Sequence, residues 1–537
     1  MQNAIGAIES LYESALASLR DRLIVGERID PERLDAEQLA AHALAYLATE
    51  LEACRQLAAY AERSGGEFEQ KIAQAYVGEV ARGLRGGVDL GPCENISIDA
   101  FGLEDGVLER TILSSQVCAF VKEFASDAVY LELGRLAREG THGARGLGDE
   151  MLEEVRSQFA RFVNTEVLPK AQQIHRDDIL IPAAIVEQMS ELGVFGLTIP
   201  EAHGGLGMSK VAMCVVTEEL SRGYIGVGSL GTRAEIAAEL ILGGGTEAQK
   251  ARWLPAIAAG EVLPTAVFTE PNFGSDLARL GTKAVRQEDG SYRISGQKTW
   301  ITHAVRADLM TLLARTNPDE AGYRGLSMFL AEKTRLDPAP GEPEFVDPGL
   351  TGTEIKVLGY RGMKEYELSF DGFEVPGDAL LGGEEGAGFK QLMRTFESAR
   401  IQTAARGVGV AQAALEDAIL YANDREQFGK PIGEFPRVAR KIGRMVCRVQ
   451  AARQLTYFSA RQKDSEKRCD LEAGMAKLLA TRAAWEGADA NVQIHGGNGF
   501  AEEYTASRLL VDARVLSIFE GANEIQAHVV ARRLLGG

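Results

Sequence analysis

The chain has 537 residues, of which 45% are hydrophobic and 25% charged, a globular composition whose length favours several domains over one. Its 58 lysines and arginines against 77 aspartates and glutamates give a formal net charge of −19, which disfavours binding to nucleic acids. No apolar run is long enough to span a membrane, the first residues lack a targeting pattern, and the six cysteines form no metal-binding pair. We therefore expect a cytoplasmic protein without a metal site.

The order of predicted elements is helices, helices, β-strands and helices again. Residues 1–145 form a helical extension that ends in a glycine-rich linker at 139–148, where a domain boundary is expected. Residues 149–263 form a second helical domain. Residues 264–383 contain short alternating segments separated by Gly, Pro and Asp, which indicates a middle β domain. Residues 384–537 return to long helical patterns. The predicted fold class is mainly α with a middle β domain.

Two motifs of the predicted β domain could hold a ligand. The segment 269–276, which reads Thr-Glu-Pro-Asn-Phe-Gly-Ser-Asp, offers backbone N–H groups and a serine to a phosphate or a flavin edge, although many turns look similar. Further on, Trp300 precedes Ile301 and Thr302. An indole can cover a flavin face and a hydroxyl can bond a ring nitrogen, whereas the ordinary interpretation is a core strand.

Three motifs interrupt the C-terminal helices. Arg425, followed by Phe428 and a glycine, could bind a pyrophosphate or simply end a helix at the surface. The segment 493–500 carries three glycines, which allow the backbone to approach a ligand closely. Glu520 precedes a glycine in an apolar stretch, where burial would raise a carboxyl pKa and suit a general base.

In order and spacing, these five motifs resemble the acyl-CoA dehydrogenase family over about residues 149–537. The resemblance implies a helical domain, a middle β domain and a C-terminal four-helix bundle that bind FAD and acyl-CoA, in a homo-oligomer that is a dimer or a tetramer. It also implies electron-transferring flavoprotein as the partner. The residues that it assigns to FAD are Phe268, Thr269, Ser275, Trp300, Thr302, Arg425, Phe428, Gln493, Gly496 and Gly497.

The resemblance also implies the chemistry. Glu520 would remove the α-proton of the thioester while the β-hydrogen leaves as hydride to flavin N5, giving a 2,3-enoyl-CoA. Some relatives carry the base on an earlier helix, at the position of Ala399, and alanine cannot act as a base. The residues that the family pattern places on the substrate are Ser275, Glu397, Arg400 and Gly521.

The helical extension narrows the expected substrate. An extension of this length, together with the segment 358–366, is similar to methylsuccinyl-CoA dehydrogenases of the ethylmalonyl-CoA pathway, which oxidise (2S)-methylsuccinyl-CoA to mesaconyl-CoA. A dicarboxylic thioester needs a cation or several donors at the far end of its pocket. Thr232 and Arg233 are the candidates, and the alternative is that Arg233 is a surface charge. Arg361 and Tyr366 are weaker candidates.

Other functions remain open at this point. The chain could be a dehydrogenase for another short or branched acyl-CoA, or an acyl-CoA oxidase that passes electrons to O₂. A non-catalytic assembly protein that reuses the fold is a further alternative, against which the retained Glu520 and flavin motifs argue.

Overall fold

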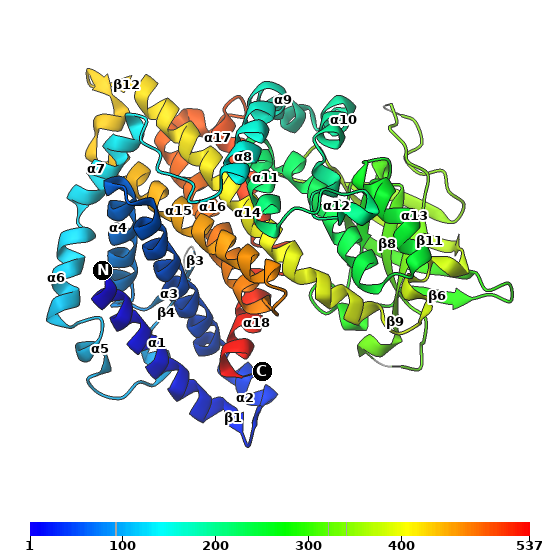
Figure 1. Ribbon diagram of the computed structural model, residues 1–537, viewed down its shortest axis with the longest axis horizontal. Helices are drawn as coiled ribbons and strands as arrows, with labels where there is room; N and C mark the ends of the chain where they lie inside the picture. Colours follow the sequence, from blue (N-terminus) through cyan, green and yellow to red (C-terminus); the bar gives the residue numbers. More distant parts are fainter. Residues whose placement is uncertain (92–93, 321, 340, 537) are drawn as a thin grey trace. The chain divides into compact units, whose positions relative to one another are not determined.

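A computed structural model describes residues 1–91, 94–320, 322–339 and 341–536. The chain folds into two compact units, one formed by residues 1–157 and 403–537 and the other by residues 158–402. The predicted fold class is confirmed, since the chain is mainly helical and its one large sheet lies between residues 264 and 375 (Figure 1). Within the described ranges, no helix combines the length and the apolar character needed to cross a bilayer.

The first unit combines the N-terminal extension with the C-terminal bundle. The extension contains α1 (Gln2–Leu23), α2 (Pro31–Ala36), α3 (Gln38–Ser64), α4 (Glu67–Gly83), α5 (Val107–Arg110), α6 (Ser115–Phe124) and α7 (Asp127–Arg138). The bundle contains α14 (Gly388–Asp424), whose first part belongs to the second unit, α15 (Pro436–Asp464), α16 (Asp470–His495), α17 (Thr505–Leu516) and α18 (Asn523–Leu535), together with the hairpin β12 (Glu426–Gln427) and β13 (Lys430–Pro431).

The sequence predicts an extension that is helical almost throughout, and most of it is helical. Two antiparallel pairs interrupt it: β1 (Ile24–Val25) with β2 (Arg28–Ile29), and β3 (Val88–Gly91) with β4 (Glu94–Ile96). In the first pair Gly26 has a φ of 67°, which a glycine adopts without strain and which turns the chain back on itself. Segments this short give no clear periodicity, so the helical pattern around them hid them.

Small residues let the extension approach the bundle closely. Helix α3, blue in Figure 1, lies beside α15 and α16, α4 lies beside α15, and α7 packs along α15. A Cβ added to Gly134 of α7 would come within 2.0 Å of the Ala439 carbonyl oxygen. A Cβ added to Gly443 of α15 would come within 2.1 Å of the Tyr130 carbonyl oxygen. Side chains at these two positions would force the helices apart.

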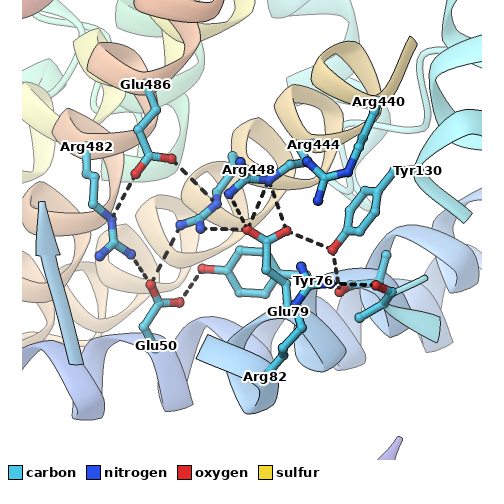
Figure 2. Close-up of polar contacts among 12 residues, drawn as sticks. Glu50, Tyr76, Glu79, Arg82, Tyr130, Arg440, Arg444, Arg448, Arg482 and Glu486 are labelled. Atoms are coloured by element: carbon cyan, nitrogen blue, oxygen red, sulfur yellow. Dashed lines mark hydrogen bonds and ion pairs between the residues drawn. The ribbon is translucent and has the colours of Figure 1, made fainter. Parts of the chain in front are cut away.

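A buried ion network joins the same helices (Figure 2). The carboxylate of Glu79 on α4 lies 2.6 Å from Arg444 and 2.9 Å from Arg448, both on α15, and accepts a 2.7 Å hydrogen bond from the Tyr130 hydroxyl. Burial would raise the pKa of Glu79, but the charges of Arg448 and Arg444 outweigh burial and hold it well below its usual range.

A second acidic residue of the extension extends this network. Glu50 on α3 is paired with Arg482 of α16 and accepts a 2.6 Å hydrogen bond from the Tyr76 hydroxyl. Because α3 and α4 supply the carboxylates and α15 and α16 supply the guanidinium groups, the network ties the extension to two helices of the bundle.

The glycine-rich segment after α7 has neither helix nor strand from residue 141 to 149, yet it is hydrogen-bonded along its length. The Ala144 carbonyl accepts from the Tyr60 hydroxyl at 2.7 Å and from the Gln450 amide at 2.8 Å. The Arg145 side chain donates to Gln412 at 2.9 Å. The segment therefore lies inside the first compact unit, and the four-domain division expected from the sequence stays a prediction.

The second unit contains helices and the sheet. Its helices are α8 (Glu150–Phe162), which begins in the first unit, α9 (Leu168–Asp177), α10 (Ala183–Glu191), α11 (Lys210–Gly223), α12 (Ile225–Gly244) and α13 (Glu247–Ala258). Its strands are β5 (Pro264–Val267), β6 (Lys283–Arg286), β7 (Tyr292–Thr302), β8 (Leu309–Arg315), β9 (Leu326–Glu332), β10 (Leu350–Ile355) and β11 (Glu365–Val375).

The seven strands form one sheet in the order β10-β11-β7-β6-β8-β5, with β9 paired to β8. The pairs β5–β8 and β6–β8 are parallel and the others antiparallel. The alternation predicted from the sequence is seen as alternating burial at the start of β7, where Tyr292 and Ile294 are buried and Arg293 and Ser295 are exposed. The long antiparallel pair β7–β11 sets Thr302 directly opposite Glu365, which matters for the site.

We expect the buried pairing of Glu79 to contribute strongly to stability. Glu79→Gln should lower the free energy of unfolding by about 3 kcal/mol, because it removes the charge of the carboxylate that lies closest to Arg444 and Arg448. The matched control is Glu139→Gln, which breaks an ion pair whose side chains are 54% and 55% exposed and should cost less than about 1 kcal/mol. Thermal unfolding of both variants measures the difference, and equal shifts would contradict a structural role for the network.

Candidate active site

Glu520 lies in the turn between α17 and α18, in the first unit. Its φ is 52° and that of Gly521 is 88°, so two consecutive residues are left-handed. For a residue with a side chain this conformation costs about 1–2 kcal/mol, and it persists only where other contacts hold it. The glycine has no such penalty, and a Cβ there would come within 2.2 Å of the Gln526 amide nitrogen. The Glu-Gly order therefore fits the turn.

The Glu520 carboxylate is held by two residues of α14. One oxygen accepts a 2.8 Å hydrogen bond from the Thr403 hydroxyl, and the other lies 2.9 Å from Arg406 Nη2. Arg406 is completely buried, donates to Thr403 at 2.8 Å and lies over the Phe519 ring at 4.7 Å from its centre. The apolar surroundings expected from the sequence are thus wrong: the base candidate is paired with a buried guanidinium.

The backbone of the turn is held by residues of α16 and α18. Lys477 of α16, which has no exposed surface, donates to the Gly521 carbonyl, and the Gln526 amide donates to the same oxygen at 3.3 Å. Sequence reasoning missed Thr403, Arg406 and Lys477. The available signal was a cation inside an alanine-rich helical stretch, since a long charged side chain is rarely buried without a role.

In the second unit, a buried lysine shapes the loop that follows β5. Lys298 Nζ donates to the Phe268 carbonyl at 2.8 Å and lies 3.0 Å from a Glu270 oxygen. Glu270 also accepts the backbone N–H groups of Gly281 and Thr282 at 2.7 and 2.8 Å. Burial lowers the pKa of Lys298 to about 8 against the opposing charge of Glu270. Thr269 is thereby fixed from both sides, while Ser275 is exposed further along the loop.

The end of strand β7 brings a second group together. Trp300 has a φ of 58° and its side chain is 56% exposed, whereas Thr302 is buried and donates to Glu365 at 3.0 Å. Burial raises the pKa of Glu365 to about 7, with Thr302 and the charge of Arg233 acting against it. His303 is also buried, and neither of its ring nitrogens has a hydrogen-bond partner among the described residues.

The remaining cofactor candidates lie in the first unit and are exposed. Phe428 stands out, because its side chain is 93% exposed and its φ is 53°. A large apolar side chain so open to solvent suits contact with a ligand or another chain. The others with exposed side chains or backbone are Arg425, Gln493, Gly496 and Gly497.

The substrate candidates of the second unit lie on α12 and α14. Thr232 is fully buried, and its hydroxyl has no hydrogen-bond partner among the described residues. Arg233 is only 9% exposed, so its interpretation as a surface charge is wrong. On α14, Ala399 is buried, whereas Glu397 and Arg400 are partly exposed. The roles assigned to these residues stay predictions.

We expect the protonation of Glu365 to be visible in stability. Its folded pKa of about 7 lies above the unfolded value of about 4.5, so its contribution is complete below pH 4.5 and is lost as the pH rises through 7. Glu365→Gln, a neutral variant that keeps an acceptor for Thr302, should therefore gain stability relative to the parent between pH 5 and pH 8, by at most about 3 kcal/mol. Thermal unfolding of both proteins at pH 5 and pH 8 measures this gain in stability. A stability difference between variant and parent that does not change with pH would refute a protonated Glu365.

Comparison with known proteins extends over both units. Acyl-CoA dehydrogenase domains match in order: the N-terminal domain over residues 149–261, the middle domain over 265–373 and the C-terminal domain over 386–535. The chain is 55% identical to a (2S)-methylsuccinyl-CoA dehydrogenase of Cereibacter sphaeroides, covering 99% of this chain and 97% of the relative.

Solved structures agree with the fold. The butyryl-CoA dehydrogenase of Megasphaera elsdenii superposes with a TM-score of 0.67 at 32% identity, covering 72% of this chain and 98% of its own. A glutaryl-CoA dehydrogenase in complex with glutaryl-CoA gives a TM-score of 0.67 at 34% identity, covering 72% and 96%. With all three domains matched in order, the chain belongs to the acyl-CoA dehydrogenase family of flavoprotein oxidoreductases.

Proposed function

We propose that this dehydrogenase oxidises (2S)-methylsuccinyl-CoA to mesaconyl-CoA. The observation that carries the proposal is the 55% identity to the Cereibacter sphaeroides enzyme, which runs over 99% of this chain and so includes the extension. The matches to the family's domains begin only at residue 149, and the butyryl-CoA and glutaryl-CoA dehydrogenase structures cover 72% of the chain. The extension therefore separates this chain and its relative from those two dehydrogenases.

Glu520 is the proposed base. It removes the α-proton of the thioester, the electron pair of that bond forms the new double bond, and the β-hydrogen leaves with its own electron pair. Thr403 and Arg406 orient the carboxylate, so that it does not have to be positioned during the reaction. Ala399 leaves no second base at the position used by some relatives.

FAD is the proposed cofactor, and when bound it accepts the β-hydrogen as a hydride. The residues present fit a flavin: Trp300 offers an indole that is more than half exposed, and two residues further on the Thr302 hydroxyl is held by Glu365. The loop around Thr269 is fixed by Lys298 and Glu270 before any ligand binds. Arg425 and Phe428 provide an exposed cation and an exposed ring for cofactor contacts. An electron-transferring flavoprotein is the proposed electron acceptor.

The proposed substrate has a second carboxylate, which needs a cation in the site to hold it. In a succinyl-type thioester this carboxylate is only two bonds from the α-carbon. A cation that holds it must therefore lie beside the base. Arg406 meets this condition, because its guanidinium contacts Glu520, and a guanidinium forms strong charge-assisted hydrogen bonds with carboxylates. We propose that Arg406 binds the distal carboxylate. Arg233 of the second unit is the candidate that the sequence offered for the same role.

Anaerobic bleaching of the flavin by a panel of acyl-CoA thioesters tests the function. We expect (2S)-methylsuccinyl-CoA to bleach the enzyme much faster than butyryl-CoA, isobutyryl-CoA or succinyl-CoA. Glu520→Gln should keep its yellow flavin and bleach at least about a thousand-fold more slowly, since it retains the shape but not the base. Bleaching by butyryl-CoA alone would overturn the substrate, and normal bleaching of the variant would overturn the base.

Arg406→Met separates recognition of the distal carboxylate from binding of the rest of the substrate. Loss of charge-assisted hydrogen bonds should weaken binding of mesaconyl-CoA about ten-fold or more, while crotonyl-CoA, which lacks the carboxylate, should bind within a factor of about three. The shift of the flavin absorption spectrum on titration measures both. Arg453→Met, which removes a buried guanidinium of another helix, α15, is the control. Equal weakening for the two ligands would refute the assignment.

A further inference from the structure

The turn that carries Glu520 contains a conformation that cannot persist unaided. Glu520 has a side chain and yet a φ of 52°, next to Gly521 with a φ of 88°. A residue with a Cβ relaxes from this region unless its surroundings fix it, and such residues cluster where a site needs a fixed orientation. The contacts that hold the turn therefore matter for the orientation of the Glu520 carboxylate.

Lys477 provides the contact on the backbone side. It lies in the middle of α16, has no exposed surface, and directs its ammonium group onto the Gly521 carbonyl. The same carbonyl accepts a longer, 3.3 Å hydrogen bond from Gln526, which is also completely buried. Burying a lysine is expensive, and a charged donor makes a stronger hydrogen bond than a neutral amide.

Two sets of contacts thus act on adjacent residues of the turn. Thr403 and Arg406 hold the Glu520 carboxylate from α14, and Lys477 holds the next residue's carbonyl from α16. We propose that Lys477 is a positioning residue for the reaction: by fixing the Gly521 carbonyl, it keeps Glu520 left-handed and its carboxylate aimed at the α-proton. Without Lys477 the turn relaxes toward the right-handed region, and the carboxylate moves away from its reacting geometry.

This inference rests on the proposed role of Glu520, and its test separates the two. Lys477→Met keeps the length of the side chain and removes the donor and the charge. In rapid mixing with (2S)-methylsuccinyl-CoA without oxygen, we expect its flavin to be reduced about ten- to a hundred-fold more slowly than in the parent. Mesaconyl-CoA should bind within a factor of about three, because Lys477 orients the base and does not recognise the ligand.

An isotope effect adds a readout that a merely structural role would not move. Substrate deuterated at the α-carbon should slow Lys477→Met by a larger factor than the parent, since misplacing the base makes proton removal the slower step. Lys477→Arg retains a cationic donor and should recover part of the rate. Lys71→Met is the matched control: Lys71 is a largely buried lysine of α4 paired with Glu132 at 2.5 Å, and its variant should react at the parent rate.

The outcomes are distinct. If the parent is bleached, Glu520→Gln is not, and Lys477→Met reacts at the parent rate, the inference is overturned and the proposed function stands. If no acyl-CoA bleaches the parent, the proposed function itself fails. If Lys477→Met does not fold or hold flavin, Lys477→Gln carries the test, because it replaces the charged donor to the Gly521 carbonyl with a neutral one. A slowed reduction with unchanged binding then supports the inference, and a parent rate overturns it.

Discussion

The ion pair between Glu520 and Arg406 constrains everything around it. Arg406 has no exposed surface, so its charge depends on a partner within the protein, and one carboxylate oxygen of Glu520 lies 2.9 Å from it. The pair fixes where α14 must run relative to the turn before α18, since Thr403 and Arg406 lie one helical turn apart and both reach Glu520. The Glu520 carboxylate, the proposed base, is thus held in one orientation by two side chains of α14.

Two buried lysines fix the backbone in a similar way, by donating to carbonyl groups. Lys298 holds the Phe268 carbonyl and Glu270 below the loop that contains Thr269, and Lys477 holds the Gly521 carbonyl beside Glu520. Both segments are irregular, so their carbonyls lack the partners that a helix or strand would supply. An ammonium group delivered from a regular element satisfies such a carbonyl and fixes its direction. Each unit therefore contains an irregular segment that is held by a lysine from a helix or a strand.

The sequence predicted the fold class and the family because those depend on local pattern. Alternation in 264–383 indicated the sheet, and five motifs in order indicated the family, which the matched domains confirm. The surroundings of Glu520 were predicted wrongly, because neighbouring letters are apolar while Arg406 lies more than a hundred positions earlier in the chain. Thr302 and Glu365 meet only through the register of β7 with β11, which no local pattern reveals. The periodicity of the sequence therefore cannot predict which distant segments pair with one another.

The extension packs against α16 and α18, two helices that hold the turn of Glu520, the proposed base. Glu50 of α3 is paired with Arg482 of α16, five residues beyond Lys477, which holds the Gly521 carbonyl. On α18, which begins three residues after Glu520, His528 meets His42 of α3 with ring centres 6.1 Å apart. Helix α3 therefore contacts α16, which carries Lys477, and α18, which follows the turn of Glu520. Because a packed interior transmits small displacements rather than absorbing them, residues far from the acyl group influence how firmly Glu520 is held. The packing of α3 therefore connects the extension physically to the turn that carries Glu520.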